Sequence, residues 1–241
     1  MPEQQAKAAL VTAGAKRLGK ALCLKLALNG FDIALHYRSS DDEARKTAAE
    51  IESLGQRCYL VQADLSKAEQ LDELLAAVIE ELPGLSVLVN NASNWQPGNF
   101  LDSSLHELRQ YMQIHLEAAY VLSRDFARLA QHGLIVNILD SNIVKESTEH
   151  FAYLLSKKAL HSFTMMAAKE LAPQIRVNAI APGAVLVPED NRKEKYEKKF
   201  GKNPLKRAGS PEDVADALEY LLKAEHVSGQ CIFVSGADHL L

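Results

Sequence analysis

The sequence predicts a single α/β domain over residues 1–241, folded as a Rossmann-like doubly wound sheet of seven parallel strands with helices on both faces. Seven short apolar segments alternate with about six segments of helical periodicity, which is the pattern of repeated strand–helix–strand units. Turns of glycine and small polar residues follow most of the apolar segments. No linker, repeat or low-complexity tract divides the chain, so we expect one domain.

The composition is that of an ordinary globular protein, with 47% hydrophobic and 24% charged residues and a net charge of −4. This charge gives no general attraction to nucleic acid or to an anionic membrane. The first residues lack the apolar core of a signal peptide, and no run approaches the ~20 apolar residues of a membrane span. Cys23, Cys58 and Cys231 are widely spaced and match no metal-binding pattern. We therefore expect a cytoplasmic protein with reduced thiols that binds no nucleic acid, membrane or metal.

The first strand and helix, Ala8–Thr12 and Arg17–Leu28, flank a tight turn that contains Gly14 and Gly19. A strand, a tight turn and a helix N-terminus form a pyrophosphate site, because backbone N–H groups point outward and the helix dipole favours an anion. The pair Asn29-Gly30 is a typical signal for the end of this helix.

Two positions of this turn depart from a three-glycine dinucleotide fingerprint, since Ala13 and Arg17 stand where glycines are expected. The geometry of the turn therefore depends on whether the backbone at Ala13 needs a positive φ. Taken alone, the motif leaves a plain strand–helix turn open as the alternative.

The second strand, Phe31–Tyr37, indicates which dinucleotide binds. Its one acid, Asp32, lies at the start of the strand and cannot reach a ribose at the other end. Arg38 follows the strand about 20 residues beyond the glycine turn, where an acid would bind the ribose of NAD and an arginine accommodates the 2′-phosphate of NADP. Arg17 adds a second positive charge. Two solvated arginines are the alternative, but we expect NADPH/NADP+ as the cofactor.

The next elements are a helix over Asp41–Leu54 and a strand over Cys58–Ala63. Asp64 at the end of that strand can accept a hydrogen bond from an adenine amino group or cap a turn, and both readings stay open. Ser66 and Glu69 predict a capping box at the start of the following helix.

The fourth strand, Ser86–Val89, runs into small polar residues that let a cofactor approach the backbone and that end at Trp95, the only tryptophan. The flat indole either stacks on a planar ligand or anchors the next helix. That long helix opens with a capping box of Ser104 and Glu107 and ends near Gln131.

The stretch from Asp140 to Lys157 is the strongest catalytic candidate. It follows the apolar strand Leu134–Leu139, so Asp140 stands at a strand's carboxyl end, where open α/β sheets bind ligands. Tyr153 and Lys157 are four residues apart in a helical segment, His150–Leu171, and share one face. A neighbouring ammonium favours the phenolate and is expected to lower the pKa of the tyrosine toward a catalytic range.

The last part of the chain completes the predicted sheet. The strand Ile175–Ile180 leads into Pro182-Gly183, and the segment 184–206 reads as a loop with a mixed-charge, solvated run. Its position after a strand end suits a mobile lid. Ser210 caps the last helix, which has proline at its first position, and Gln230–Val234 forms the final strand.

Right-handed crossovers place all the strand ends on one edge, and the ordered set of motifs there resembles the short-chain dehydrogenase/reductase family from end to end. The matching pieces are T-A-G-A-K-R-L-G at 12–19, A-D-L at 63–65, N-N-A at 90–92, Tyr153-x-x-x-Lys157 and A-P-G at 181–183. Within the family the chain is most similar to the pteridine reductases and dihydromonapterin reductases. That similarity rests on K-R-L-G with H-Y-R-S, N-N-A-S followed by Trp95, Asp140 where most relatives have serine, and Q-I-H at 113–115.

The resemblance implies an NADPH-dependent oxidoreductase that reduces a C=N bond of a dihydropterin or dihydrofolate, with Tyr153 donating or relaying a proton and Lys157 holding the nicotinamide ribose. It also implies a homo-oligomer, with a tetramer as the expected form. The substrate contacts it implies come from Ser93, Trp95, Asp140 and Tyr153. The cofactor contacts it implies come from Gly14, Arg17, Leu18, Arg38, Ser39, Asp64, Leu65, Asn91, Ala92, Ser93, Tyr153, Lys157, Pro182 and Gly183.

Two other functions remain open at this point. One is a carbonyl reductase of the 3-oxoacyl type, for which serine in place of Asp140 is expected. The other is a non-catalytic NADP-binding protein, which the presence of both Tyr153 and Lys157 disfavours. His115 stands where many relatives have an asparagine that anchors a water-mediated proton relay, although a lone histidine on a helix is more often a hydrogen-bonded structural residue.

Overall fold

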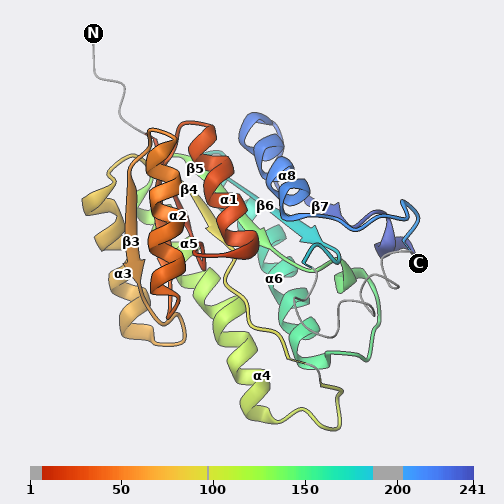
Figure 1. Cartoon of the computed structure of the whole chain (residues 1–241). Helices are drawn as coiled ribbons and strands as arrows, with labels where there is room; N and C mark the ends of the chain where they lie inside the picture. The colour runs from red at the N-terminus through yellow and green to blue at the C-terminus, as the bar shows by residue number, and fades with distance from the viewer. Residues whose placement is uncertain (1–6, 97, 187–202) are drawn as a thin grey trace.

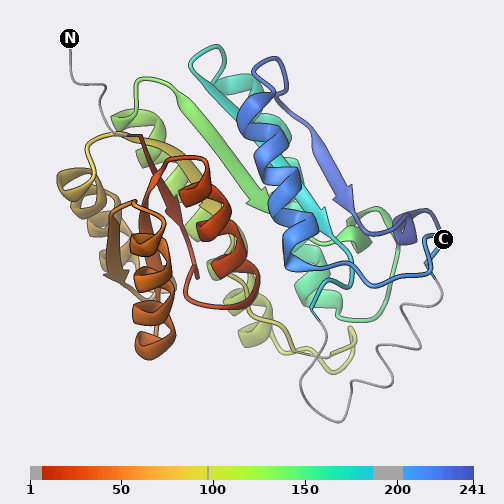
Figure 2. The ribbon, with the colours of Figure 1, turned by 45° about the horizontal axis from the view of Figure 1, so that its top comes forward.

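The structure, a computed structural model, describes residues 7–96, 98–186 and 203–241. Its centre is the predicted parallel sheet of seven strands (Figures 1 and 2). The strand order in the sheet is β3-β2-β1-β4-β5-β6-β7. Most of the strand residues are buried, because helices cover both faces of the sheet. The strands are β1 (Ala8–Val11), β2 (Asp32–Tyr37), β3 (Cys58–Gln62), β4 (Leu85–Asn90), β5 (Gly133–Ile138), β6 (Ile175–Pro182) and β7 (Cys231–Val234).

Helices form a layer on each side of the sheet. The helices are α1 (Arg17–Leu28), α2 (Asp41–Ser53), α3 (Ala68–Glu81), α4 (Leu105–Met112), α5 (Ala118–Leu129), α6 (Phe151–Glu170) and α8 (Pro211–Lys223), with the short turns η1 (Gln113–Glu117), η2 (Ser141–Val144) and η3 (Asp238–Leu240). The apolar sides of α1, α2 and α8 pack in one core cluster, and those of α3, α5 and α6 contribute to a second. Figure 1 shows α1, α2 and α8 in front of the sheet.

The strand order reverses between β1 and β4, because the chain runs outward from β1 to β3 and then returns to β4. In open α/β sheets the crevice at such a reversal is the usual ligand site. Hydrogen bonds link the segments that follow β1 and β4 on either side of this crevice. The Thr12 hydroxyl accepts from the backbone N–H groups of Asn91, at 2.8 Å, and Ala92, at 2.9 Å.

A row of buried polar side chains fixes α6 to the sheet. Asn90 donates to the side-chain oxygen of Asn137 at 2.8 Å, and Asn137 donates to the Thr164 hydroxyl at 2.9 Å. A buried amide that lost its partner would cost about 1–3 kcal/mol. The row therefore sets the position of α6, the helix that carries Tyr153, relative to β4 and β5.

The capping box predicted from Ser66 and Glu69 is wrong. The helix α3 begins at Ala68, and no side chain caps it. The hydroxyl and the backbone N–H of Ser66 instead donate to Asp64, at 2.7 and 3.0 Å. The ionised carboxylate of Asp64 is a strong hydrogen-bond acceptor close in sequence. Ser66 therefore donates to Asp64 and does not form the predicted capping box with Glu69.

The long helix predicted from Ser104 to Gln131 is interrupted. Its capping box of Ser104 and Glu107 forms as predicted, but the turn η1 is π-helical and separates α4 from α5. Turns of this kind are frequent at functional sites. This one contains His115, whose side chain is 1% exposed.

Most of the segment predicted as a lid lies outside the described residues, so that expectation stays a prediction. Within the part of the chain that the structure describes, no helix combines the length and the apolar character needed to cross a bilayer.

Candidate active site

The turn after β1 has the geometry of a phosphate cradle despite its missing glycines. Ala13 and Arg17, the two departures from the fingerprint, both adopt positive φ, at 52° and 54°. Gly19 cannot be replaced, because a Cβ there would lie 2.0 Å from the carbonyl oxygen of Ala13. A Cβ on Gly14 would meet the sulfur of Cys23 at 2.8 Å. The chain therefore accepts backbone strain at two positions to keep the fingerprint's path.

His36, for which the sequence predicts no role, holds this turn in place. The backbone N–H of Ala13 donates to its Nδ1 at 3.0 Å, so Nε2 carries the ring hydrogen and donates to the carbonyl of Ala63 at 3.0 Å. Burial lowers the pKa of His36 to about 4, and the ring is neutral at pH 7. The sequence feature that could have indicated this role is a histidine at a buried position of the apolar strand β2.

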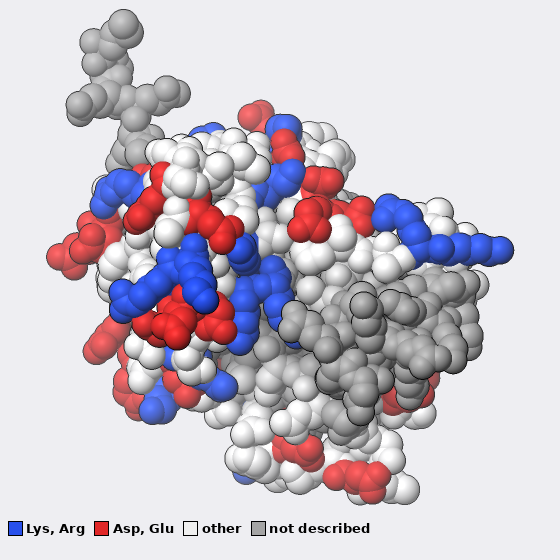
Figure 3. Space-filling model, in the orientation of Figure 1, with Lys and Arg blue, Asp and Glu red and all other residues white. Residues whose placement is uncertain are grey.

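The two arginines expected to select NADP follow two paired strands: Arg17 is the first residue of α1, after the turn that follows β1, and Arg38 directly follows β2. Arg17, Arg38 and Ser39 are all exposed at this edge of the sheet. Figure 3 shows Lys and Arg side chains concentrated near the lower end of α1. The side chain of Gln62 donates to the carbonyl of Arg38 at 2.9 Å and fixes the backbone there.

Two other residues expected to contact the cofactor, Asp64 and Asn91, make hydrogen bonds within the protein. The carboxylate of Asp64 accepts from Ser66 and so caps a turn, and these hydrogen bonds lower its pKa. The amide of Asn91 donates to the carbonyls of Thr12 and Ala13, which clamps the phosphate turn. The side chains of Leu18 and Leu65 are buried in the core, so only their backbones are open to a ligand.

The structure brings Asp140, Tyr153 and Lys157 together. The phenol of Tyr153 donates to Oδ2 of Asp140 at 3.1 Å, and the Lys157 Nζ lies 5.9 Å from the centre of the tyrosine ring. Lys157 is 2% exposed and donates to the carbonyl of Ile138, the last residue of β5, at 2.8 Å. The other oxygen of Asp140 accepts from the backbone and side chain of Asn142, at 2.8 and 2.9 Å.

The expected depression of the Tyr153 pKa is not found. Burial raises the pKa of Tyr153 well above 10, and the neighbouring Asp140 raises it further. Burial lowers the pKa of Lys157 to about 8, although Asp140 opposes that shift. The phenol is therefore held in its protonated form, which is the form that can donate a proton.

His115 lies directly beside this group, in a chain of hydrogen bonds. Its Nε2 is 3.0 Å from the Ser93 hydroxyl, and its Nδ1 is 2.7 Å from the hydroxyl of the buried Ser156. Ser156 in turn donates to the carbonyl of Tyr153 at 2.6 Å. Burial, and then the charge of Lys157, lower the pKa of His115 well below 6.5, so the ring is neutral.

Trp95 stands at the open side of the site. Its side chain is 41% exposed, and its ring lies 4.6 Å from the ring of His150, tilted by 51°. His150 precedes α6 and adopts a left-handed conformation with φ of 55°. The indole thus contacts the residue that precedes α6, whereas the sequence alternative named the next helix, α4. Stacking on a planar ligand stays a prediction.

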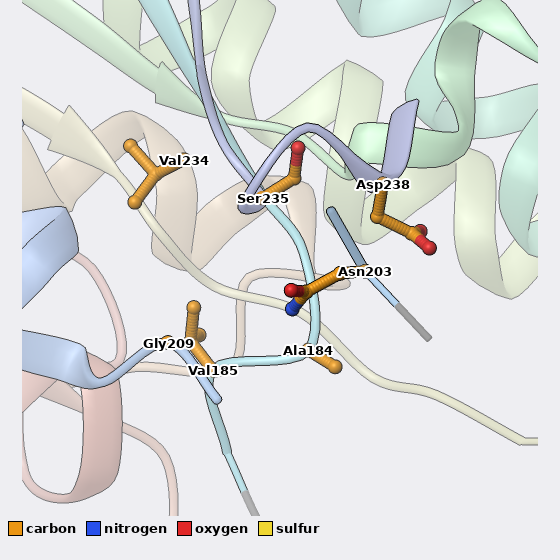
Figure 4. Close-up of a pocket in the computed structure, with 7 residues that line it drawn as sticks. All are labelled: Ala184, Val185, Asn203, Gly209, Val234, Ser235 and Asp238. Atoms are coloured by element: carbon orange, nitrogen blue, oxygen red, sulfur yellow. The ribbon is translucent and has the colours of Figure 1, made fainter. Parts of the chain in front are cut away.

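A small hollow lies beyond the ends of β6 and β7 (Figure 4). It is lined by Ala184, Val185, Asn203, Gly209, Val234, Ser235 and Asp238. Its volume of about 30 Å³ is enough for ordered water but not for a substrate ring. Of the expected site residues near it, Pro182 is buried, and Gly183 packs so tightly that a Cβ would lie 2.9 Å from Ser235.

A dinucleotide-type turn, basic side chains at the ends of β1 and β2 and a Tyr–Lys pair beside a carboxylate together define a nicotinamide-dependent oxidoreductase class. The family model described as short chain dehydrogenase matches residues 7–198, and the chain belongs to this family.

Curated relatives and solved structures cover nearly the whole chain. A dihydromonapterin reductase from Klebsiella pneumoniae is 30% identical over all of both chains. A crystal structure described as FolM alternative dihydrofolate reductase 1 from Brucella suis, in complex with NADP, is 35% identical, with a TM-score of 0.93 over 98% of this chain and 96% of that one. An acetoin dehydrogenase from Enterobacter cloacae is 32% identical, with a TM-score of 0.90 over 99% of this chain and 97% of that one.

Proposed function

We propose that this protein reduces a C=N bond of a dihydropterin or dihydrofolate with NADPH. The observation that carries the proposal is the hydrogen bond between Tyr153 and Asp140, because a carboxyl group at this position suits protonation of a basic ring nitrogen. Two of the similar proteins named above are pterin or folate reductases.

The residues present fit NADPH. Gly19 lets the turn pack against Asn91, because a Cβ there would lie 2.0 Å from the carbonyl oxygen of Ala13 and 2.9 Å from the Asn91 amide nitrogen. The turn leads into the N-terminus of α1, which would hold the pyrophosphate. Arg17 and Arg38 would hold the 2′-phosphate, and Lys157 would hold the nicotinamide ribose. When bound, the reduced nicotinamide supplies the hydride for the substrate carbon.

The chain's own residues supply the proton. Before the reaction the phenolic hydrogen of Tyr153 is donated to Asp140, which holds the phenol in position. In the reaction this hydrogen passes to the substrate nitrogen. The raised pKa keeps Tyr153 protonated until the nitrogen gains electron density. Lys157 places a positive charge behind the ring and favours the phenolate that remains.

Trp95 supplies the flat surface for the substrate. Its free face would stack on a pterin ring, and its contact with His150 limits how far the indole can turn.

The alternative is a carbonyl reductase, and the similarity to an acetoin dehydrogenase is the observation in its favour. Asp140 argues against it, because a carboxylate beside a carbonyl oxygen repels the alkoxide that forms. A non-catalytic protein has no use for the buried Tyr153 and Lys157.

We also propose a cytoplasmic homo-oligomer, with the tetramer as the expected form. The three cysteines are free, which suits a reducing compartment. Large apolar side chains stand exposed on neighbouring helices, with Tyr120 on α5 53% exposed and Met166 on α6 72% exposed.

The test is NADPH consumption by the purified protein with a dihydropterin, dihydrofolate and a panel of ketones. We expect turnover with a dihydropterin or dihydrofolate at a kcat/KM at least ten times that of the best ketone. Turnover of ketones alone would support the alternative.

A further inference from the structure

We infer that His115 takes up the hydroxyl hydrogen of Ser93, so that Ser93 meets the substrate only as a hydrogen-bond acceptor. The inference rests on the proposed function and adds to it. It states that the site selects a substrate edge that carries N–H or amino donors, as a reduced pterin does.

The direction of the hydrogen bonds begins at Ser156. Its Oγ is 2.6 Å from the carbonyl oxygen of Tyr153. A carbonyl oxygen can only accept, so Ser156 donates its one hydroxyl hydrogen to Tyr153. The same Oγ lies 2.7 Å from Nδ1 of His115 and must accept in that bond. Nδ1 of His115 therefore carries the ring hydrogen.

A neutral imidazole has one N–H, so Nε2 of His115 is a bare acceptor. It lies 3.0 Å from the Ser93 Oγ, and Ser93 therefore donates to it. Two other acceptors near this hydroxyl also belong to the protein: the carbonyl of Asn94 at 3.3 Å and the phenol oxygen of Tyr153. In each of these orientations the Ser93 hydrogen is donated to a protein group and not to the substrate.

The lone pairs of Ser93 remain available because the residue is exposed at the site, whereas His115 behind it is 1% exposed. The carboxylate of Asp140 is a second acceptor on the same side of the crevice. A carbonyl substrate offers no donor to either group, while the N–H and amino groups of a dihydropterin match them. His115 thus acts as a positioning residue that sets specificity through Ser93.

Two variants separate this role from simple packing. In His115→Gln the side-chain oxygen can reach the position of Nε2 and accept from Ser93. In His115→Asn the shorter amide reaches only the position of Nδ1, keeps the contact with Ser156 and frees the Ser93 hydroxyl. We expect His115→Asn to weaken dihydropterin binding about three- to tenfold and His115→Gln to restore it.

Binding is measured by quenching of the single tryptophan, Trp95, as a dihydropterin is added. The ratio of kcat/KM for pterin to that for ketone is expected to fall in His115→Asn, because the freed hydroxyl can donate to a carbonyl. In a Ser93→Ala background the Asn substitution is expected to have no further effect on pterin binding. Equal losses with and without Ser93 would overturn the inference.

The ¹⁵N shifts of the His115 ring test the hydrogen-bond direction without any substrate. We expect a neutral ring protonated at Nδ1, with an Nε2 shift that moves in Ser93→Ala. A ring protonated at Nε2 overturns the inference whatever the substrate is. A wild type that binds no dihydropterin but shows the expected tautomer overturns the proposed function and leaves the assignment of Ser93 standing.

Discussion

At the scale of single residues, Tyr153 and Asp140 share one hydrogen bond but have different roles in the proposed mechanism. Tyr153 gives up a proton, whereas Asp140 directs the phenol and raises its pKa. Replacing Tyr153 with phenylalanine keeps the aromatic ring and removes only the hydroxyl that donates the proton.

Tyr153→Phe should therefore lower kcat by about 100-fold or more, the usual contribution of a positioned acid. NADPH affinity, measured by fluorescence titration, should change little. Lys157→Ala should impair both, since one ammonium serves the ribose and the phenol. If Tyr153→Phe retained most of the pterin reduction, Asp140 or a water would be the donor.

Arg38 carries the prediction about the cofactor. Arg38→Ala removes a charge-assisted contact to the 2′-phosphate, which should weaken NADPH binding by ~1.5–3 kcal/mol and leave NADH binding almost unchanged. Dissociation constants for both cofactors check this. Equal losses for NADPH and NADH would show that Arg38 does not contact the 2′-phosphate.

Sequence spacing predicts Asp140, Tyr153 and Lys157 as one group because two of them are a helical turn apart and the third ends a strand. It gives no sign of the partners of His36 and His115, which lie 23 and 41 residues away in the chain. It also misses the direction of the Tyr153 pKa shift, because burial is a property of the folded chain and outweighs the lysine.

At the scale of elements, His36 links three segments: it lies in β2, holds the turn after β1 and contacts the end of β3. Its pKa of about 4 in the folded state is below the ~6.5 of an unfolded chain. As the pH falls from 6.5 to 4, the unfolded state binds a proton that the folded state refuses. The free energy of unfolding therefore decreases by about 3 kcal/mol between pH 6.5 and pH 4, and His36 causes no such decrease above pH 7.

His36→Asn keeps an acceptor near Ala13 but does not titrate. Its free energy of unfolding should fall less steeply than that of the wild type between pH 6.5 and 4, with a difference of about 3 kcal/mol at the lower end. Urea titrations at several pH values measure this. The exposed His106, changed to asparagine, serves as the control and should follow the wild-type curve. Parallel curves for His36→Asn and the wild type would contradict the assignment.

The elements themselves are largely predictable from periodicity, and the order of strands and helices agrees with the prediction except where the helix predicted from Ser104 to Gln131 is divided. Two details were missed. Ser66 donates to Asp64 and does not cap a helix, and the turn around His115 is π-helical inside an uninterrupted helical pattern. Neither outcome changes the hydrophobic pattern from which elements are predicted.

At the scale of the whole molecule, the exposed apolar side chains of α5 and α6 lead to a prediction about assembly. Light scattering should give a mass of four chains of 26.5 kDa. Met166→Glu places a charge in the proposed contact and should reduce that mass. Leu28 on α1, 66% exposed, provides the matched control, and Leu28→Glu should leave the mass unchanged. A monomeric wild type would contradict the proposed assembly.

The central claim is that Asp140 makes this short-chain reductase a pterin enzyme. The most direct measurement is kcat/KM for one dihydropterin and one ketone, with NADPH, in the wild type and in Asp140→Ser. We expect the wild type to prefer the dihydropterin, and we expect Asp140→Ser to lose kcat on it while keeping or gaining activity on the ketone. A wild type that ignores the dihydropterin, together with an Asp140→Ser variant identical to it on the ketone, would contradict the claim.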